Sequence, residues 1–389
     1  MSRTRGGDLF VRSTPMESAS GWIYGLLSAN PLPDTTLTPR AALDAALLPA
    51  LQAGPCYVAF SGGRDSSALL AAATQLARRE GLEPPIPVTR LHPDLPDTDE
   101  SQWQHQVIGH LRLREWIQLR FSSDDLDLLG PEARAGVKAI GPIWPPALHP
   151  QRAMFRELEP GWLLTGEGGD AVIANRRGTP LTLIRRRKRI SGTLALLAAG
   201  ALAPRALRRA QLIRELQTSG HERWLRPAAL ARHTALLAED IVGEPLRYDD
   251  GTWFIRRQRY FAALIQNFAG VAAGYGLTTL NPLLDAGFIA ALARTGGRWG
   301  YRGRTDTFKA LFSDVLPITV LSRTSKASFN TAYTGPATRE FARTWDGSGV
   351  DPELVDIDRL RKVWLSDRPT MATGQLLHNA WLAQRGAAL

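Results

Sequence analysis

Short apolar runs alternate with longer amphipathic stretches through the first half of the chain. Four runs read as buried strands: CYVAF at 56–60, a run within 81–93, EWIQLRF at 115–121 and WLLT at 162–165. The stretches between them, at 66–80, 97–113 and 150–161, are predicted helices: 66–80 is rich in alanine and leucine, and 97–113 is amphipathic. Strands that alternate with helices predict an α/β fold with a parallel, doubly wound sheet.

Helical patterns dominate from about residue 193 to the C-terminus. The predicted helices there are 194–203, 221–243, 254–276, 285–294, 307–317 and 375–385. Two helix starts carry capping signals: Thr38 followed by Pro39, and Asp97 followed by Glu100 three residues later. We therefore expect an N-terminal extension at 1–50, a sheet-containing region at 51–175 and a mostly helical region at 176–389.

Composition narrows the class of protein. The chain has 389 residues, of which 44% are hydrophobic and 22% charged, so it is long enough for a large globular core. Its single cysteine, Cys56, excludes a disulfide framework within the chain, and the basic N-terminus lacks the apolar segment of a signal peptide. No apolar stretch reaches the ~20 residues of a membrane span, and we expect a cytoplasmic protein.

The formal net charge of +10 is concentrated in two basic patches, at 176–189 and 204–214. Charge runs of this kind are typical of solvated helix faces. Because no aromatic residues alternate with the arginines, the patches argue against single-stranded nucleic acid as a partner.

The stretch SGGRDSS, at 61–67, lies between a predicted strand and a predicted helix. Its two glycines permit close approach of the backbone to an anion, its serines add hydroxyl donors, and the helix start directs N–H groups at the same place. An aspartate in such a cradle, Asp65, is explained if it holds Mg²⁺ against the phosphates. No Gly-Lys pair occurs, which excludes the standard P-loop.

Two other motifs have competing interpretations. TGEGGDA at 165–171 fits a dinucleotide fingerprint, but arginines stand where the acid about twenty residues later is expected, which disfavours a nicotinamide cofactor. HPDLPDTDE at 92–100 offers carboxylates and a histidine for a metal. A polar loop that leads into an acidic helix start explains that composition more simply.

SGGRDSS resembles the loop of the ATP pyrophosphatases, and LLTGEGGDAVIANRR at 163–177 resembles the second signature of asparagine synthetases. The relatives of that family include β-lactam synthetases and lasso-peptide macrolactam synthetases. Segments 280–292 and 302–329 are similar to the later family signatures, in family order across roughly residues 50–385. The resemblance implies an ATP- and Mg²⁺-dependent synthetase that converts a carboxylate to an acyl-adenylate and releases pyrophosphate and AMP.

The resemblance also implies roles for individual residues. Asp65 and Asp170 would hold Mg²⁺, and Lys326 would stabilise the negative charge that develops during the reaction. Glu100 matches the acid at the start of the helix after the second strand, and Asp285 matches a polar position near the site. The nucleotide-binding residues implied are Ser61, Gly62, Gly63, Asp65, Ser66, Ser67, Gly166, Glu167, Gly168 and Lys309.

Three departures from the family change the expected reaction. Position 2 is a serine rather than the cysteine nucleophile of a glutaminase domain, and we expect no glutamine hydrolysis by that route. Ala171 follows Asp170 where the family has a glutamate. Residues 135–150 contain no carboxylate where asparagine-forming enzymes place one, and Trp144 with its neighbouring prolines predicts a stiff apolar wall. This wall favours a substrate bulkier than aspartate.

These patterns predict an asparagine-synthetase-like amide ligase, with 51–175 binding nucleotide and 176–389 binding substrate. The expected acid is a peptide or carrier-bound acid, and macrolactam formation is attractive because an amine held near the adenylate gains ~7–11 kcal/mol from proximity. Free ammonia and ammonia from a partner glutaminase are the other sources of nitrogen. The basic patches are a hypothetical dock for an acidic leader peptide or carrier protein. The alternative is a catalytically idle nucleotide-binding scaffold that partners a glutaminase or a maturation enzyme.

Overall fold

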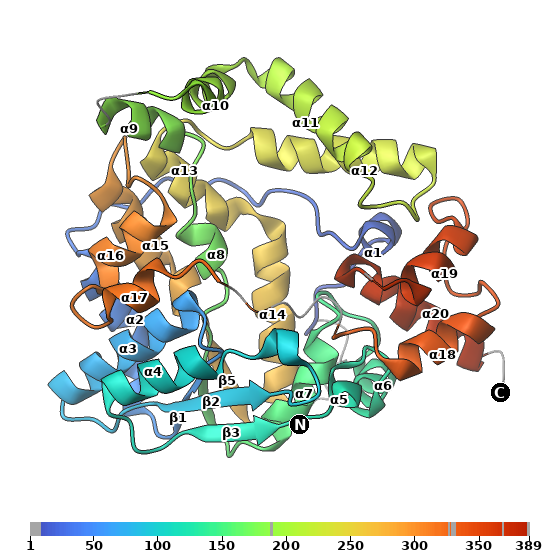
Figure 1. The fold of residues 1–389 in the computed structure, drawn as a ribbon, viewed down its shortest axis with the longest axis horizontal. Coiled ribbons are helices and arrows are strands. Elements are labelled where there is room, and N and C mark those ends of the chain that lie inside the picture. The colour runs from blue at the N-terminus through green and yellow to red at the C-terminus, as the bar shows by residue number, and fades with distance from the viewer. Residues whose placement is uncertain (1–8, 187–189, 326, 328–331, 368, 387–389) are drawn as a thin grey trace, which may run out of the picture.

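A five-stranded parallel sheet forms the base of the molecule (Figure 1). The structure, a computed structural model, describes residues 9–186, 190–325, 327, 332–367 and 369–386. The strand order is β3-β2-β1-β4-β5. The strands are β1 Cys56–Ala59, β2 Ile86–Leu91, β3 Ile117–Arg120, β4 Gly161–Leu164 and β5 Leu277–Leu280. The predicted parallel α/β fold and its four strands are confirmed, and β5 is a fifth strand that the sequence pattern did not reveal.

Helices occupy most of the remaining chain. Those before β5 are α1 Pro15–Ser20, α2 Pro39–Gln52, α3 Arg64–Arg79, α4 Ser101–Leu111, α5 Ser123–Leu126, α6 Pro131–Ile140, α7 Leu148–Arg156, α8 Gly169–Val172, α9 Thr179–Arg186, α10 Gly192–Leu202, α11 Arg205–Ser219, α12 Pro227–Val242, α13 Tyr248–Phe254 and α14 Arg259–Ala273. Those after it are α15 Ala286–Gly296, α16 Arg304–Phe312, α17 Ile318–Ser322, α18 Pro336–Thr344, α19 Ile357–Leu365 and α20 Gly374–Gly386. Within the described ranges, no helix has the length and apolar character that crossing a membrane requires.

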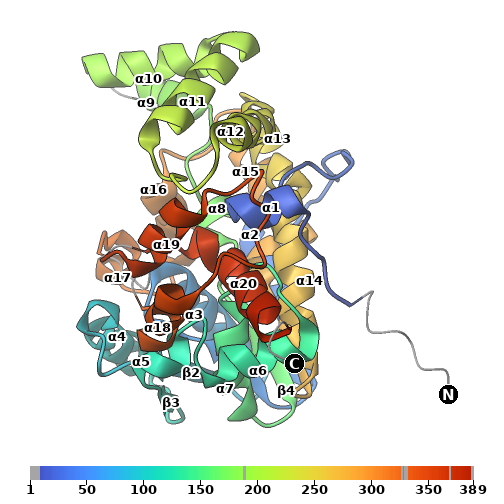
Figure 2. The same cartoon turned by 90° about the vertical axis from the view of Figure 1, so that its right-hand side faces the viewer.

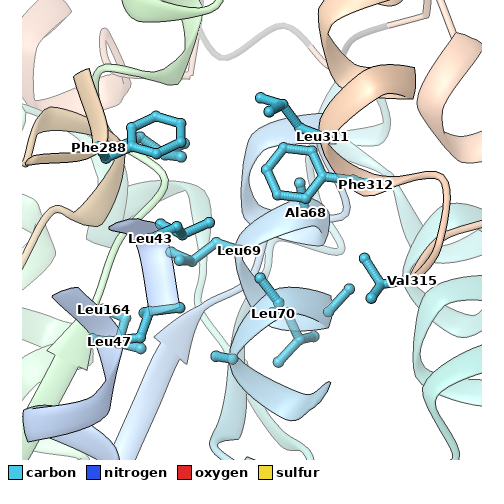
Figure 3. Packing of buried hydrophobic residues seen from close by; sticks show 14 of the residues in the cluster. Leu43, Leu47, Ala68, Leu69, Leu70, Leu164, Phe288, Leu311, Phe312 and Val315 are labelled. Carbon is cyan, nitrogen blue, oxygen red and sulfur yellow. The ribbon is translucent and has the colours of Figure 1, made fainter. Parts of the chain in front are cut away.

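Both faces of the sheet are buried, because side chains of a strand alternate between its two faces. Val58 and Leu164 pair in register and pack with α2, α3 and α15 on one face. Tyr57 and Leu163, the neighbouring register pair, pack with α7 and α14 on the other face. Figure 3 shows the first of these cores, where Leu43 of α2 and Leu69 of α3 approach Phe288 of α15. Helices far apart in sequence, from α2 to α17, thus pack against the sheet, whereas no described residue of α9 to α12 belongs to these two cores.

The two predicted helix caps had different outcomes. Thr38 caps α2 by accepting a hydrogen bond of 3.2 Å from the amide of Ala41, as predicted. Asp97 does not cap α4 and lies instead in a 3₁₀ turn, and α4 begins at Ser101. The expected cap was wrong because the carboxylate of Glu100 makes a buried ion pair with Arg323 and does not fold back onto its own helix start.

Buried neutral histidines make the stability of this fold sensitive to acid. His149 of α7 and His378 of α20 pack with ring centroids 5.0 Å apart. Burial lowers the pKa of His378 from 6.5 to about 4 and holds the pKa of His149 well below its ordinary value. The unfolded chain therefore binds more protons than the native protein between about pH 6.5 and pH 4, and stability must fall as pH falls through that window.

We expect the urea midpoint to drop steeply from pH 6.5 to pH 4 and to change little from pH 7 to pH 8. Replacing His378 with glutamine should flatten the acid side of this profile, because one of the groups that takes up a proton on unfolding is removed. Equilibrium urea denaturation at several pH values measures this. An unchanged acid slope in the His378→Gln protein would contradict the assignment.

Candidate active site

The site lies where the strand order reverses. β1 and β4 are neighbours, β2 extends the sheet on one side and β5 on the other, so the connections after β1 and β4 leave in opposite directions. Ligands of open parallel sheets bind at such a switch point, beyond the carboxyl ends of the strands. Both glycine-rich loops identified in the sequence follow these two strands. The fold therefore brings together two motifs that are about a hundred residues apart.

The first loop is held in shape by its own serines. Gly62 has φ of 84°, a left-handed conformation that disfavours any residue with a Cβ. The Ser61 hydroxyl accepts from the amide of Gly63 at 3.2 Å and lies 3.1 Å from the Ser66 hydroxyl, which donates to the Gly63 carbonyl. Gly63 then caps the start of α3. The loop turns the helix start toward the cavity described below, as an anion cradle requires.

Glycines of the second loop let it touch the first. A Cβ on Gly166 would lie 3.0 Å from the amide nitrogen of Ser66, and one on Gly169 would lie 2.2 Å from Oδ1 of Asp65. The second value is shorter than any real contact, so only glycine fits there. The glycines of GEGGD therefore serve close packing between the loops in addition to any approach to phosphate.

Arg304 joins the two acids of the predicted metal site. Its Nη2 atom donates to both carboxylate oxygens of Asp65, at 2.8 and 2.7 Å, and lies 2.9 Å from Oδ1 of Asp170. Its Nη1 atom donates to the carbonyl of Gly169 at 2.9 Å. The Asp65 and Arg304 side chains are about one-fifth exposed, whereas Asp170 is open to solvent. The two carboxylates thus converge on a single cationic group at the start of α16.

This arrangement fits a magnesium ion that is shared with phosphates. Proteins usually hold Mg²⁺ with one or two carboxylates, and substrate phosphates and water complete the octahedron. Asp65 and Asp170 supply two carboxylates that already face one cation, and no cluster of three or more potential ligands occurs among the described residues. Arg304 occupies the position between the acids, so its side chain must shift for an ion to bind both.

A second arginine ties the chain after α17 to the first loop. Arg323 is buried and donates to the Gly62 carbonyl and to Oε1 of Glu100, each at 2.7 Å. The same carboxylate oxygen accepts from the amide of Ala327 at 2.7 Å. Arg323 also lies over the ring of Trp103, 4.6 Å from its centroid. Through Glu100, the loop, α4 and the segment after α17 form one hydrogen-bonded unit.

A cavity of about 590 Å³ opens between the two loops. Its lining includes cations and acids, which we call the charged side: Arg64, Arg90, Arg304, Arg323, Asp65, Glu167 and Asp170. It also includes large apolar and aromatic residues, which we call the apolar side: Trp144, Met154, Tyr260, Phe261, Leu264 and Phe268. Burial, reinforced by the neighbouring Arg304 guanidinium, lowers the pKa of Arg64 from its ordinary value. These arginines make part of the cavity strongly positive, which suits binding of a polyanion. The apolar residues suit an apolar group of the ligand beside it.

The structure gathers most of the predicted site residues but not all of them. Ser61, Gly63, Asp65, Ser66, Gly166, Glu167, Gly168 and Asp170 line the cavity. Gly62 and Ser67 do not line it, and Ser67 is fully buried beneath the loop. Lys309 is half-buried on α16 away from the lining, and Asp285 caps α15 by accepting from the amide of Phe288. Lys326 lies outside the described residues.

Sequence reasoning missed the arginines that organise the site. Arg64 stands inside SGGRDSS, and Arg323 is three residues before Lys326, so both had a local signal in their position within a motif. Arg304 also lies within the signature-like segment 302–329, but nothing in the local pattern sets it apart from the neighbouring Arg302. Tyr260, which lies on the apolar side of the cavity, was covered only by a helix prediction.

Replacing Gly169 with alanine tests the contact between the loops. The new methyl group has no room beside Asp65, so we expect the second loop or the carboxylate to move and ATP binding to weaken about 10-fold or more. Calorimetric titration with Mg²⁺ and ATP measures this. Gly109→Ala is the matched control, because Gly109 is also helical and no other part of the protein lies within 4 Å of the place that its Cβ would take. Equal ATP affinity in both variants would contradict the proposed packing.

Comparison with known protein families agrees with this geometry. No curated protein matches the chain. The family described as asparagine synthase matches residues 40–383, which include both loops, all five strands, Arg304 and Arg323. The match covers far more than half of the sequence, and the chain therefore belongs to the asparagine synthase family.

Proposed function

We propose that this protein is an ATP-dependent amide ligase that activates a bulky carboxylic acid as its acyl-adenylate. The observation that carries the proposal is the convergence of Asp65 and Asp170 on one cation at the mouth of a cavity that has a charged side and an apolar side. A polyphosphate suits the charged side, and an organic acid suits the apolar side. Membership of the asparagine synthase family supports the same class of reaction.

The proposed reaction has two steps. A carboxylate oxygen of the acid attacks the α-phosphorus of ATP, the bond to the bridging oxygen breaks, and pyrophosphate leaves. An amine nitrogen then attacks the acyl carbon, AMP leaves and the amine loses a proton. When bound to Asp65 and Asp170, Mg²⁺ would neutralise phosphate charge.

The residues of the chain have roles in this scheme. Arg64, Arg304 and Arg323 place positive charge around the first loop, where charge on the departing pyrophosphate must be balanced. The helix start at Gly63 adds its N–H groups. Lys326, which lies outside the described residues, is the proposed stabiliser of the reacting α-phosphate because the segment 302–329 resembles the C-terminal signature of the family.

The apolar side of the cavity supports a substrate larger than aspartate. The Trp144 indole donates to the Gly21 carbonyl at 3.0 Å, and its backbone carbonyl accepts from the side chain of Asn267. Its ring packs edge-on against Tyr260, with centroids 6.3 Å apart. A wall fixed in this way accepts an apolar side chain or a peptide better than a second carboxylate, which would lose hydration there. An internal amine, giving a macrolactam, is our preferred nucleophile.

Exchange of labelled pyrophosphate into ATP, measured with a panel of amino acids, fatty acids and peptides, tests the proposal. We expect exchange with bulky apolar or peptide acids and none with aspartate. Trp144→Ala should raise the KM for the preferred acid about 10- to 100-fold and leave the KM for ATP unchanged, whereas Trp144→Phe should restore most of the loss. Exchange with aspartate alone, or an ATP KM that changes with Trp144, would contradict the assignment of the apolar side.

The scaffold alternative has an observation in its favour. Arg304 already pairs with both acids, and Ala171 stands where the family has a further acid. A scaffold would bind ATP tightly and show no exchange with any acid in the panel. That combination would replace the ligase proposal.

A further inference from the structure

The excess of positive charge in this protein comes from one part of the chain. Residues 171–214 contain eleven Lys and Arg and no Asp or Glu, whereas the whole chain has a formal net charge of +10. The rest of the chain is therefore close to neutral. Arg187, Lys188 and Arg189 lie outside the described residues, and the surface discussed here is built from the others. These cations lie on α9 and α11 and in the turn before α9.

The same part of the chain exposes large aliphatic side chains. We define an apolar ridge by the five residues Ile190, Leu196, Leu197, Leu202 and Leu207, each more than half exposed. Leu196 reaches 75% exposure. Only Leu194, Ala198 and Ala201 of α10 are buried, although all eleven of its residues are Ala, Leu, Gly or Thr and none carries a charge. Contiguous exposed apolar surface of this kind marks a site of interaction with a protein or a membrane.

The ridge stands at an outer edge of the molecule. Both views place α10 and α11 at the rim, and Figure 2 shows them clear of the sheet and of α14. α10 packs on α9, whereas α11 packs on α12. The space between α10 and α11 is lined by Leu196, Leu197 and Leu212. Leu196 and Leu197 border this groove and are nonetheless 75% and 57% exposed, so much of their apolar surface is open to solvent at the edge of the molecule.

Cations flank the ridge on both sides. Arg185 and Arg186, at the end of α9, are exposed on one side. On the other side Arg205 and Arg209 share a single carboxylate, Glu239, at 2.6 and 2.5 Å, so the group keeps an excess of positive charge. Apolar side chains that insert among lipid headgroups, beside arginines that meet anionic phosphates, are the two components of peripheral membrane binding.

We propose that the α9–α11 edge docks the protein on an anionic lipid surface. α10 has 11 residues and is therefore about 16 Å long, far less than the ~30 Å of a bilayer core, so it would lie in the interface with its leucines among the headgroups. An acidic partner peptide would satisfy the arginines, but it would leave a ridge of outward-facing leucines without cover. The proposal does not depend on the proposed function.

Sedimentation with lipid vesicles tests this proposal on the full chain. We expect binding to phosphatidylcholine vesicles that contain phosphatidylglycerol, weak binding to phosphatidylcholine alone, and a marked loss of binding at high salt. Leu196→Glu/Leu197→Glu should reduce binding to anionic vesicles about 10-fold or more. Arg185→Gln/Arg186→Gln should reduce it and weaken its dependence on salt. Leu37→Glu, at an exposed leucine elsewhere on the molecule, is the control and should bind like the native protein.

Circular dichroism should be the same for all of these variants, because the substituted side chains are exposed. The thermal midpoint should change only for Arg185→Gln/Arg186→Gln, and slightly, because Arg185 lies over the Trp299 ring, 4.7 Å from its centroid. Three results would overturn the proposal. The first is that the native protein does not bind anionic vesicles. The second is that the Leu37→Glu control loses as much vesicle binding as the Leu196→Glu/Leu197→Glu variant. The third is that the protein binds an acidic leucine-containing peptide and does not bind vesicles. The last result would assign the edge to a protein partner instead.

Discussion

Pyrophosphate exchange is expected to fall at least ~100-fold when Asp65 is replaced by asparagine. Asparagine keeps the size of the side chain and one oxygen acceptor, but it removes the negative charge that faces Asp170 across the Arg304 guanidinium. A site left with one carboxylate holds a divalent cation more weakly, and the phosphates lose the ion that would neutralise them. Exchange kinetics at rising Mg²⁺ concentrations measure the loss, and high Mg²⁺ should recover part of it.

Asp358→Asn is the matched control for this experiment. Asp358 is an exposed aspartate on α19 that pairs with Arg361 at the surface, so exchange should remain at the native level. The circular dichroism spectrum of Asp65→Asn should also match the native spectrum. If Asp65→Asn retains full exchange and the same requirement for Mg²⁺, the proposed metal site is wrong. If the native protein shows no exchange either, the scaffold alternative applies.

The buried pair of Glu100 and Arg323 is expected to have the largest effect on stability. Both side chains are buried, and removing one charge leaves the other without compensation in a poorly solvated place. Breaking such a pair typically costs about 3–5 kcal/mol in the free energy of unfolding. Glu100→Gln keeps an acceptor for the amide of Ala327 but leaves the Arg323 guanidinium uncompensated. We expect this variant to unfold at a markedly lower urea concentration.

A double-mutant cycle separates the pair from its surroundings. Arg323→Met should be destabilising for the same reason, and the combined Glu100→Gln/Arg323→Met protein should recover part of the loss because no uncompensated charge remains. All three variants should also lose exchange activity, since Arg323 holds the Gly62 carbonyl of the first loop. Additive losses in the double variant would show that the two side chains do not interact as described.

Much of the fold could be predicted because its signals are local. The run CYVAF, the glycine-rich loop and the alanine-rich helix that follows it lie within 25 consecutive residues, and the structure has them as β1, the turn at Gly62 and α3. Thr38 and Pro39 likewise mark the start of α2 as its N-cap and its first residue. β5 escaped notice because Leu-Thr-Thr-Leu is short and carries no clear alternation, and it is a strand only because β4 pairs with it.

Some features of the candidate site are likewise visible in the sequence, whereas others depend on tertiary packing. SGGRDSS and TGEGGD, with their glycines and acids, are visible in the sequence alone, and so is the absence of a carboxylate from the segment around Trp144. That Trp144 shares a cavity with Asp65 depends on how α7 and α14 pack against the sheet. Periodicity gives the buried face of a helix, but it does not give the partner that covers that face.

Local sequence was enough to establish the class of fold and to predict the two glycine-rich loops and their two acids as a site, since each depends on residues close together in the chain. The contacts by which Arg304 joins Asp65 to Asp170, and Arg323 joins Glu100 to the first loop, arise from tertiary packing. These partners are separated by more than 130 residues. An arginine looks the same in sequence whether it faces solvent or a buried carboxylate, because its local pattern does not record which distant segment folds against it.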